Sequence, residues 1–352
     1  MLIRLGLWVF LALGSLLTST LVLGRALPGG AQLLLEGESD GIHDLMLADV
    51  TRALTINLTR TPDTHEEHAA WSADGALLAF IRQDMASNQL RQVCIRRLPA
   101  AAQVCLPAVA LWDDYPRWSP DGGRLLIESI DETFGAELYR LSIDDGSAEP
   151  LTRAAGNDAQ ASWSPDGRRI VFMTFREGLR KLYLMSSGGG PVRALTSPDS
   201  NAINPAWSPD GRRIAYVTDR DIGEEIYLID VDCLDDLACD GASSRLTHLQ
   251  ALTTDLHWSS DGETLAFVSM SDGDFDVYTL EIESGDLRQW THDPEVDEDP
   301  AWSPGGEALA FISSREGPYN VYIQTGPDSP AARLTDGKMN YWTPLWRPGS
   351  AN

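Results

Sequence analysis

Short apolar runs recur along the chain at nearly constant spacing, and polar turn residues bound each of them. Six runs are five residues long: Leu77–Ile81, Leu125–Ser129, Ile170–Thr174, Ile214–Thr218, Leu265–Ser269 and Leu309–Ser313. Apolar runs of this length between turn signals predict buried β-strands rather than helices. After residue 30 no stretch has a helical period, so the pattern indicates an all-β chain.

A Trp-Ser-x-Asp-Gly phrase stands before each run. The copies are Trp71–Gly75, Trp118–Gly122, Trp163–Gly167, Trp207–Gly211 and Trp258–Gly262, followed by the variants Trp302–Gly306 and Trp346–Gly349. From Trp to Trp the steps are 47, 45, 44, 51, 44 and 44 residues. Asp-Gly favours tight hairpin turns, and a period of roughly 40–50 residues is typical of propellers and solenoids. We interpret the repeated Trp and Asp residues as architectural.

The first and last repeat units are incomplete in complementary ways. Residues 33–60 match the second, third and fourth strands of later units but lack the Trp-bearing first strand, while nothing follows the strand that ends at Trp346. Joined, the two pieces make one blade and close a ring without exposed sheet edges. We therefore predict a closed β-propeller of four-stranded antiparallel blades over residues 31–350, with seven blades and six as the alternative.

Residues 1–27 are predicted to form an N-terminal hydrophobic helix. After Arg4, the 20 residues from Leu5 to Gly24 carry no charge, which is long enough to span a bilayer. No Ala-x-Ala cleavage site follows, so an uncleaved anchor is favoured over a cleaved signal peptide. We expect an extracytoplasmic protein, periplasmic or at the cell surface, tethered to the cytoplasmic membrane by residues 5–24.

The chain is strongly acidic. It has 27 Lys and Arg against 52 Asp and Glu, a formal charge of −25, with 43% hydrophobic residues. Such a charge repels nucleic acids and anionic membrane surfaces, and it favours cations or basic partners. We therefore expect no nucleic-acid partner, and contact with the membrane only through the N-terminal helix.

The four cysteines form two local pairs, Cys94 with Cys105 and Cys233 with Cys239. The first pair lies in two neighbouring predicted strands, and the second brackets an acidic loop. Even, local pairing in an exported chain predicts disulfides. A structural zinc site is not indicated, because no Cys-x-x-Cys or Cys/His spacing is present.

The repeated phrase, the apolar second strand, a third strand of the Ile226-Tyr227 type and a terminal Leu-Thr together resemble the TolB-type, WD-like β-propeller repeat. Similar repeats occur in the propeller domains of prolyl-oligopeptidase-like and tricorn-type peptidases. The resemblance covers about residues 31–350 and implies an exported propeller with a protein partner. It implies no peptidase activity, because the chain contains no Gly-x-Ser-x-Gly nucleophile elbow.

The residues just before each Trp are predicted to surround one mouth of the central channel, because innermost propeller strands line that channel. This position is the most acidic recurring one in the chain. The candidate binding residues are Glu66, His68, Asp113, Asp114, Tyr115, Asp158, Asn204, Asp255, Asp297, Asp299, Tyr341 and Trp342. Carboxylates gathered around a concave mouth attract cations.

Several ligand classes fit this mouth. A basic peptide or protein segment is favoured, because charge complementarity guides association. Carbohydrate is an alternative, since Trp112, Tyr115, Tyr341 and Trp342 could stack on sugar rings. A bound metal is another, at His65–His68 or Asp272–Asp276, although neither has the spacing of a zinc or EF-hand motif. A solvated rim without any ligand is the remaining possibility.

No catalytic residue, cofactor or defined metal site is predicted, because the sequence singles out no nucleophile, acid pair or ligand set. The function predicted from sequence is a non-enzymatic extracytoplasmic scaffold that binds a protein partner with a basic segment. The alternative is an envelope propeller that binds or processes carbohydrate, such as a metal-assisted lyase.

Overall fold

The computed structural model describes residues 30–85, 90–99, 102–110, 112–131, 135–154, 156–231 and 243–349. The named elements in these ranges are all β-strands, β1 to β28, and the one helical residue described is Val231, in a 3-10 turn after β18. Within a sheet, consecutive strands pair antiparallel, and the sheets are built from units of four strands. The prediction of an all-β chain of four-stranded antiparallel sheets is therefore confirmed.

The strands form seven groups of four, which we number as blades from the N-terminus and write from the innermost strand outward. Blade 1 contains β28 (Asn340–Trp346), β1 (Gln32–Ser39), β2 (Ile42–Asp49) and β3 (Leu54–Asn57). Blade 2 contains β4 (Thr64–Trp71), β5 (Leu77–Asp84), β6 (Arg91–Arg97) and β7 (Gln103–Cys105). Blade 3 contains β8 (Trp112–Trp118), β9 (Arg124–Asp131), β10 (Gly135–Ser142) and β11 (Ala148–Pro150). Blade 4 contains β12 (Asp158–Trp163), β13 (Arg169–Thr174), β14 (Lys181–Ser186) and β15 (Arg193–Ala194).

The remaining blades follow the same order. Blade 5 contains β16 (Ala202–Trp207), β17 (Arg213–Asp221), β18 (Gly223–Asp230) and β19 (Ser243–Arg245). Blade 6 contains β20 (Thr253–Trp258), β21 (Thr264–Ser269), β22 (Asp276–Glu281) and β23 (Leu287–Gln289). Blade 7 contains β24 (Asp297–Trp302), β25 (Leu309–Ser313), β26 (Asn320–Gln324) and β27 (Ala332–Arg333).

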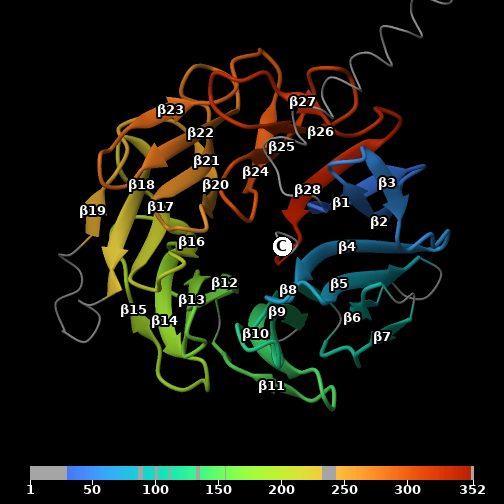
Figure 1. Ribbon diagram of the computed structural model, residues 1–352. Coiled ribbons are helices and arrows are strands. Elements are labelled where there is room, and N and C mark those ends of the chain that lie inside the picture. The colour runs from blue at the N-terminus through green and yellow to red at the C-terminus, as the bar shows by residue number, and fades with distance from the viewer. Residues whose placement is uncertain are drawn as a thin grey trace, which may run out of the picture.

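The blades are arranged around a ring (Figure 1). The innermost strands contact their neighbours in a complete circuit, from β28 through β4, β8, β12, β16, β20 and β24 back to β28. Blades 2 and 3 also share one parallel bridge, between Arg91 and Trp112. In blade 1 the last strand of the chain, β28, pairs with the first, β1, so the two ends of the described chain belong to one sheet.

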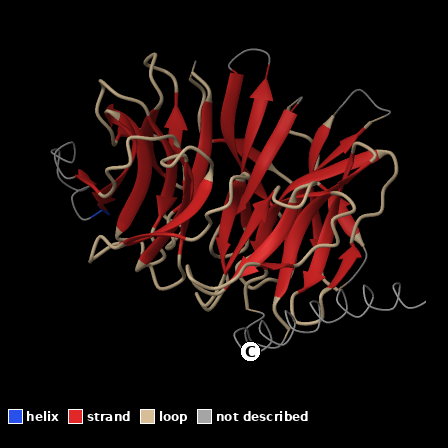
Figure 2. Ribbon diagram, turned by 90° about the horizontal axis from the view of Figure 1, so that it is seen from above, coloured by secondary structure: helices blue, strands red, loops and turns tan. Residues whose placement is uncertain are grey.

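Seen from the side, the strands run between two faces of the disc (Figure 2). One face carries the Trp-Ser-x-Asp-Gly turns between first and second strands, and we call it the turn face. The other carries the connections between second and third strands and between successive blades, and we call it the loop face. Because neighbouring strands are antiparallel, these two sets of connections lie at opposite ends of every blade.

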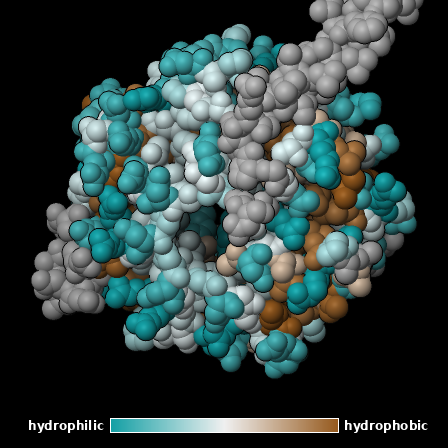
Figure 3. Space-filling model, viewed as in Figure 1, coloured by the Kyte–Doolittle hydropathy of each residue, from teal (hydrophilic) through white to brown (hydrophobic). Residues whose placement is uncertain are grey.

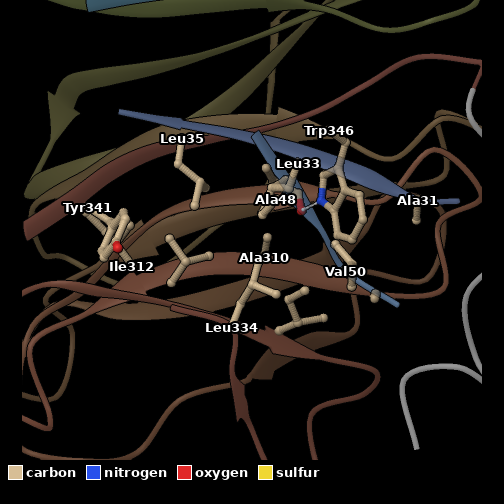
Figure 4. Packing of buried hydrophobic residues seen from close by; sticks show 14 of the residues in the cluster. Ala31, Leu33, Leu35, Ala48, Val50, Ala310, Ile312, Leu334, Tyr341 and Trp346 are labelled. Carbon is tan, nitrogen blue, oxygen red and sulfur yellow. Dashed lines mark hydrogen bonds between the residues drawn. The ribbon is translucent and has the colours of Figure 1, made fainter. Parts of the chain in front are cut away.

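The hydrophobic core is divided into seven clusters, each packed between two adjacent sheets. The cluster between blades 7 and 1 contains Leu33 and Leu35 of β1, Ala310 and Ile312 of β25, and Trp346 (Figure 4). A blade buries both of its faces in this way. This explains why the second strands are continuous apolar runs rather than alternating ones.

The repeated Trp residues join successive blades. In five copies the indole Nε1 donates a hydrogen bond to a main-chain carbonyl of the preceding blade, as Trp118 does to Ala70 at 2.9 Å and Trp346 to Ala301 at 3.0 Å. The rings of Trp118, Trp163 and Trp258 are each less than a tenth exposed. The contacts agree with the architectural interpretation of this residue.

The disulfide between Cys94 and Cys105 is formed, and the two residues face each other across β6 and β7. That prediction is confirmed. Cys233 and Cys239 lie outside the described residues, as does the expected N-terminal helix over residues 1–27. Among the elements that are described, none is a helix of the length and hydrophobicity needed to cross a membrane.

Candidate functional site: the channel mouth

Each innermost strand is interrupted by a β-bulge just before its Trp. The register shifts between the residue four places and the residue one place before the Trp, for example between Asp114 and Arg117 in β8. The residue three places before each Trp is left-handed in all seven blades, with φ between 47° and 55°. Such residues are His68, Tyr115, Gln160, Asn204, Asp255, Asp299 and Thr343.

We call these seven residues the channel ring. None of them is glycine, and a left-handed conformation costs other residues roughly 1–2 kcal/mol each. A bulge re-aims the side chain that it carries, and here it turns one side chain per blade toward the centre. Figure 3, which views the turn face, shows a hollow at the centre of the ring with hydrophilic residues prominent around it.

The ring residues contact each other from blade to blade. Gln160 Nε2 donates to Asn204 Oδ1 at 2.8 Å, and the main-chain N–H of Asn204 donates back to Gln160 Oε1 at 2.9 Å. The Thr343 N–H donates to Asp299 Oδ2 at 3.3 Å, and the rings of His68 and Tyr115 stack at 4.3 Å. The sequence spacing therefore brings these residues together around one axis.

Three carboxylates gather on the blade 6 and blade 7 side, and we call Asp255, Glu298 and Asp299 the acidic arc. Burial raises the pKa of Asp299 to about 7, and the charges of Asp255 and Glu298 act in the same direction. Burial also raises the pKa of Asp255 and of Glu298. Within the part of the chain that the structure describes, no lysine or arginine forms an ion pair with any of the three.

Two further buried glutamates lie in blades 1 and 3, Glu36 of β1 and Glu128 of β9. Burial raises the pKa of each to about 7. Glu128 Oε1 accepts a hydrogen bond from the Gln160 N–H at 2.7 Å, whereas Glu36 Oε1 is buried without a hydrogen-bond partner.

These two glutamates occupy equivalent positions in their blades. Each lies in the second strand and pairs with the residue four places before the Trp. In the other five blades this position is aliphatic or Met: Ile81, Met173, Val217, Val268 and Ile312.

Between these glutamates lies an ion-paired group centred on Arg91 of β6. Its guanidinium is buried, donates to Glu67 and, at 2.9 Å, to Asp114, and lies 4.8 Å above the Trp112 ring. Asp114 also hydrogen-bonds His68. Burial acts to lower the pKa of His68, but the hydrogen bond and charge of Asp114 outweigh it and raise that pKa. Arg91 therefore compensates the charges of Glu67 and Asp114, whereas no such cation lies in the acidic arc.

The residues five places before each Trp do not line the channel, which corrects the sequence-based expectation. Glu66, Asp113, Asp158, Asp297 and Tyr341 are each at most 3% exposed. Strand alternation, with the bulge still ahead, directs them into the blade instead.

Each of these buried acids has partners inside the fold. Asp158 receives two hydrogen bonds from Arg176 at 2.9 and 3.1 Å, and Asp297 receives two from Arg315 at 2.9 Å. Asp113 accepts from Ser129 and from two main-chain N–H groups. Glu66 accepts from Thr61 and Thr64. These carboxylates stabilise the loop face and are not free to bind a ligand.

The other candidates fall into two groups. His68, Asp114, Tyr115, Asn204, Asp255 and Asp299 belong to the bulged segments of the innermost strands, and their role in binding stays a prediction. Trp342 is partly buried, with its ring 4.5 Å from that of Tyr319, and packs against the core between blades 7 and 1. In the described ranges no group of three or more His, Cys, Asp or Glu has an arrangement that could hold a metal ion.

Sequence reasoning missed Glu36, Glu128 and Arg91. None of the three lies within five residues before a repeated Trp, the interval that defines the predicted mouth. A signal was present, because lining up the second strands places two glutamates in a column of aliphatic residues and Met. In the third strands, Gln92 is the equivalent of Asp44, Glu137, Glu225 and Asp276, and Arg91 comes one residue earlier, where blades 1, 3, 5 and 6 have His43, Ala136, Glu224 and Phe275.

Comparison with known proteins gives the family of this architecture. The model of the TolB beta propeller domain matches residues 70–233 and 199–352. The chain is 43% identical over 56 residues to the "uncharacterized peptidase YuxL" of Bacillus subtilis, a match that spans 16% of this chain and only 8% of that protein.

Solved structures share the fold at low identity. TolB from Acinetobacter baumannii superposes with a TM-score of 0.57 and 20% identity, covering 89% of this chain and 81% of that one. An oligogalacturonate lyase in complex with manganese superposes with a TM-score of 0.66 and 17% identity, covering 85% and 87%. At these identities the likeness concerns the fold alone.

Proposed function

Because the chain belongs to the TolB beta propeller domain family, we propose that it is a non-enzymatic binding scaffold whose channel mouth receives a basic segment of a protein partner. The propeller supplies a rigid frame, and the function depends on the residues that the frame presents. We further propose an extracytoplasmic location, in agreement with the charge-free run at Leu5–Gly24 and the disulfide between Cys94 and Cys105.

The observation that carries this proposal is the acidic arc. The charge of Asp255 raises the pKa of Glu298, the charges of Asp255 and Glu298 raise the pKa of Asp299, and the three lack a cationic partner among the described residues. A lysine or arginine side chain placed between them would relieve this repulsion and supply the missing counter-charge. Net charge supports the same partner, since a chain of −25 attracts basic segments over a distance.

Binding at the arc is linked to pH. A cationic group binds the ionised carboxylates, and burial holds the pKa of Asp299 at about 7. Below pH 7 the partner must displace a proton from Asp299, whereas above pH 7 the carboxylate is already ionised. Affinity is therefore expected to rise between pH 6 and 8 and then to level off.

A crosslinking pull-down of the full chain from envelope extract tests the proposal. The test variant combines Asp255→Asn, Glu298→Gln and Asp299→Asn. The control combines Asp144→Asn, Asp286→Asn and Glu283→Gln, three exposed acids outside the channel, so that both variants lose the same charge. We expect a partner with a Lys- or Arg-rich segment to be captured by the native protein and the control and lost by the arc variant. Equal capture by all three would refute a role for the arc.

The absence of catalysis is part of the proposal and has its own test. The fold is shared with an oligogalacturonate lyase in complex with manganese, so oligogalacturonate with added Mn²⁺ is the substrate to try first. We expect no turnover above the level without protein. Turnover that a chelator abolishes would replace the scaffold proposal with a metal-assisted lyase.

A further inference from the structure

Exposed large hydrophobic side chains are unevenly distributed over the molecule. Within the described residues they fall on the loop face or on outermost strands, and none falls on the turn face. Those on the loop face are Met85, Leu90, Trp112, Tyr115, Ile130, Phe175, Ile222, Leu252 and Met270. Those on outermost strands are Leu54, Ile56, Val104 and Leu287. Apolar side chains that gather on one face indicate a contact surface more strongly than scattered ones do.

The first group lies where blades 2 and 3 meet, and we call Met85, Leu90, Trp112 and Ile130 patch A. Trp112 pairs with Ile130 across β8 and β9, and the bridge from Arg91 to Trp112 brings Leu90 beside them. Met85 and Leu90 flank the connection between β5 and β6. Their side chains are 37–51% exposed.

The second group lies where blades 5 and 6 meet, and we call Ile222, Leu252 and Met270 patch B. The Met270 N–H donates to the Leu252 carbonyl at 3.0 Å, and a β-bridge between Glu224 and Ala251 brings Ile222 beside Leu252. Ile222 is 78% exposed and Leu252 54%, which makes them two of the most exposed large apolar residues described. Patches A and B lie on opposite sides of the ring, with the channel between them (Figure 1).

Charge limits what can cover these patches. Exposed carboxylates stand beside patch B, namely Asp219, Asp272 and Asp274, and the acidic arc belongs to the neighbouring blades. A second copy of this chain would bring like charges together, and an anionic lipid surface would be repelled. The complementary occupant is a protein segment that combines basic side chains with apolar ones.

We infer that patches A and B are docking points on either side of the channel for a single partner segment, basic at its centre and aliphatic or aromatic toward its ends. The inference rests on the proposed function, since the basic centre is the group received at the acidic arc. Apolar side chains that become buried on the patches supply affinity, and the carboxylates supply orientation and selectivity. A segment that is only basic would bind weakly and non-specifically.

Selection from a random-peptide phage library on the full-length native protein tests this chemistry directly. We expect the enriched sequences to combine Lys or Arg with Leu, Ile, Phe or Trp. The synthetic peptide with the strongest enrichment is then titrated against two variants. Variant one carries Ile222→Ser, Leu252→Ser and Met270→Ser in patch B. Variant two carries Leu54→Ser, Val104→Ser and Leu287→Ser on outermost strands, and so removes similar exposed apolar side chains elsewhere.

The patch B variant is expected to bind the peptide about tenfold or more weakly, while the outer-strand variant binds like the native protein. All six positions are exposed, so both variants should keep the native melting temperature. Enriched peptides that are basic but not apolar, with affinity lost only in the arc variant, would overturn the inference and leave the proposed function standing. Peptides without basic residues, or no enrichment at all, would overturn both.

Discussion

The turn face and the loop face are built from the same repeated units but differ in how alike their copies are. On the turn face, five copies repeat one hydrogen bond from the Ser hydroxyl to the Asp carboxylate two residues later, at 2.5–2.6 Å. In the same turns the Asp carboxylate accepts the N–H that follows the Gly, as Asp166 does from Arg168. Nothing in these turns distinguishes one blade from another.

On the loop face, equivalent positions hold different chemistry. Five residues before the Trp, blades 4 and 7 have an Asp paired with an arginine, blade 3 has an Asp held by Ser129 and main-chain N–H groups, and blade 6 has the neutral Thr253. Because each of these residues is compatible with a stable blade, the residue type at this position can vary between blades, whereas the turn residues cannot. Residues that are the same in every blade, as on the turn face, support the architecture. Equivalent residues that differ between blades, as on the loop face, indicate the surface that gives this propeller its own function.

The largest effect is expected from a substitution that breaks an ion pair on the loop face. Arg315→Met leaves the fully buried Asp297 without its arginine, which should lower the free energy of unfolding by about 3–5 kcal/mol. Urea denaturation measures the loss. The double variant Asp297→Thr with Arg315→Met carries the Thr of blade 6 at this position and should recover most of it, because the fully buried carboxylate is gone and Asp293, the other partner of Arg315, is 27% exposed. A single variant within about 1 kcal/mol of native would contradict the structural role assigned to this pair.

The next effect concerns Glu128 on the channel wall. Burial raises its pKa from 4.5 to about 7, so the folded protein binds more protons than the unfolded chain between those values. Stability therefore falls as pH rises through this window, by up to about 3 kcal/mol, and the loss is complete above pH 7. Glu128→Gln keeps an acceptor for the Gln160 N–H and removes this loss. Between pH 5 and pH 8 the free energy of unfolding, measured by denaturation, should decrease less in the variant than in the native protein. Equal decreases in the two proteins would disprove this prediction.

A smaller and uniform effect is expected on the turn face. Asp166→Ala removes the acceptor of the Ser164 hydroxyl and of the Arg168 N–H, at a cost of about 1–2 kcal/mol. The same substitution at Asp210 or Asp261 should cost the same within about 0.5 kcal/mol, because the hydrogen bonds are alike. Thermal denaturation of the three variants compares them. Unequal losses would show that the turns are not interchangeable.

The smallest effect is expected from repairing Trp302–Gly306, the turn between a first and a second strand that lacks the Asp. In Trp302–Gly306 the Ser303 hydroxyl reaches only Glu307, at 3.4 Å. Gly305→Asp should provide the missing acceptor and stabilise the protein by about 0.5–1 kcal/mol. A side chain at this position meets the carboxylate end of Glu307, which can move aside. A lower melting temperature would indicate that Glu307 cannot move and that this turn is adapted to Gly.

The fold was predictable because its signals are local and repeated. A Trp, an Asp-Gly turn and a five-residue apolar run recur in fixed order, and each specifies a strand or turn without reference to distant residues. The pairing of Cys94 with Cys105 followed in the same way, since the two cysteines belong to neighbouring strands. The site was only partly predictable. His68 and Asp255 lie at the bulge of their strands, where their binding role stays a prediction, whereas Asp158 and Asp297, two residues farther from the Trp, are fully buried in the blade.

The sequence by itself determined the repeating unit, its number of strands and the acidic character of the residues before each Trp, because hydrophobic spacing and turn residues act over a few positions along the chain. Only the tertiary structure decided which carboxylates face the channel. The bulge in each innermost strand turns one residue toward the axis, and arginines distant in sequence from the channel ring, such as Arg315 and Arg91, neutralise some acids and leave Asp255, Glu298 and Asp299 without a counter-charge. Charge compensation depends on distances in space, and the chain order does not contain them.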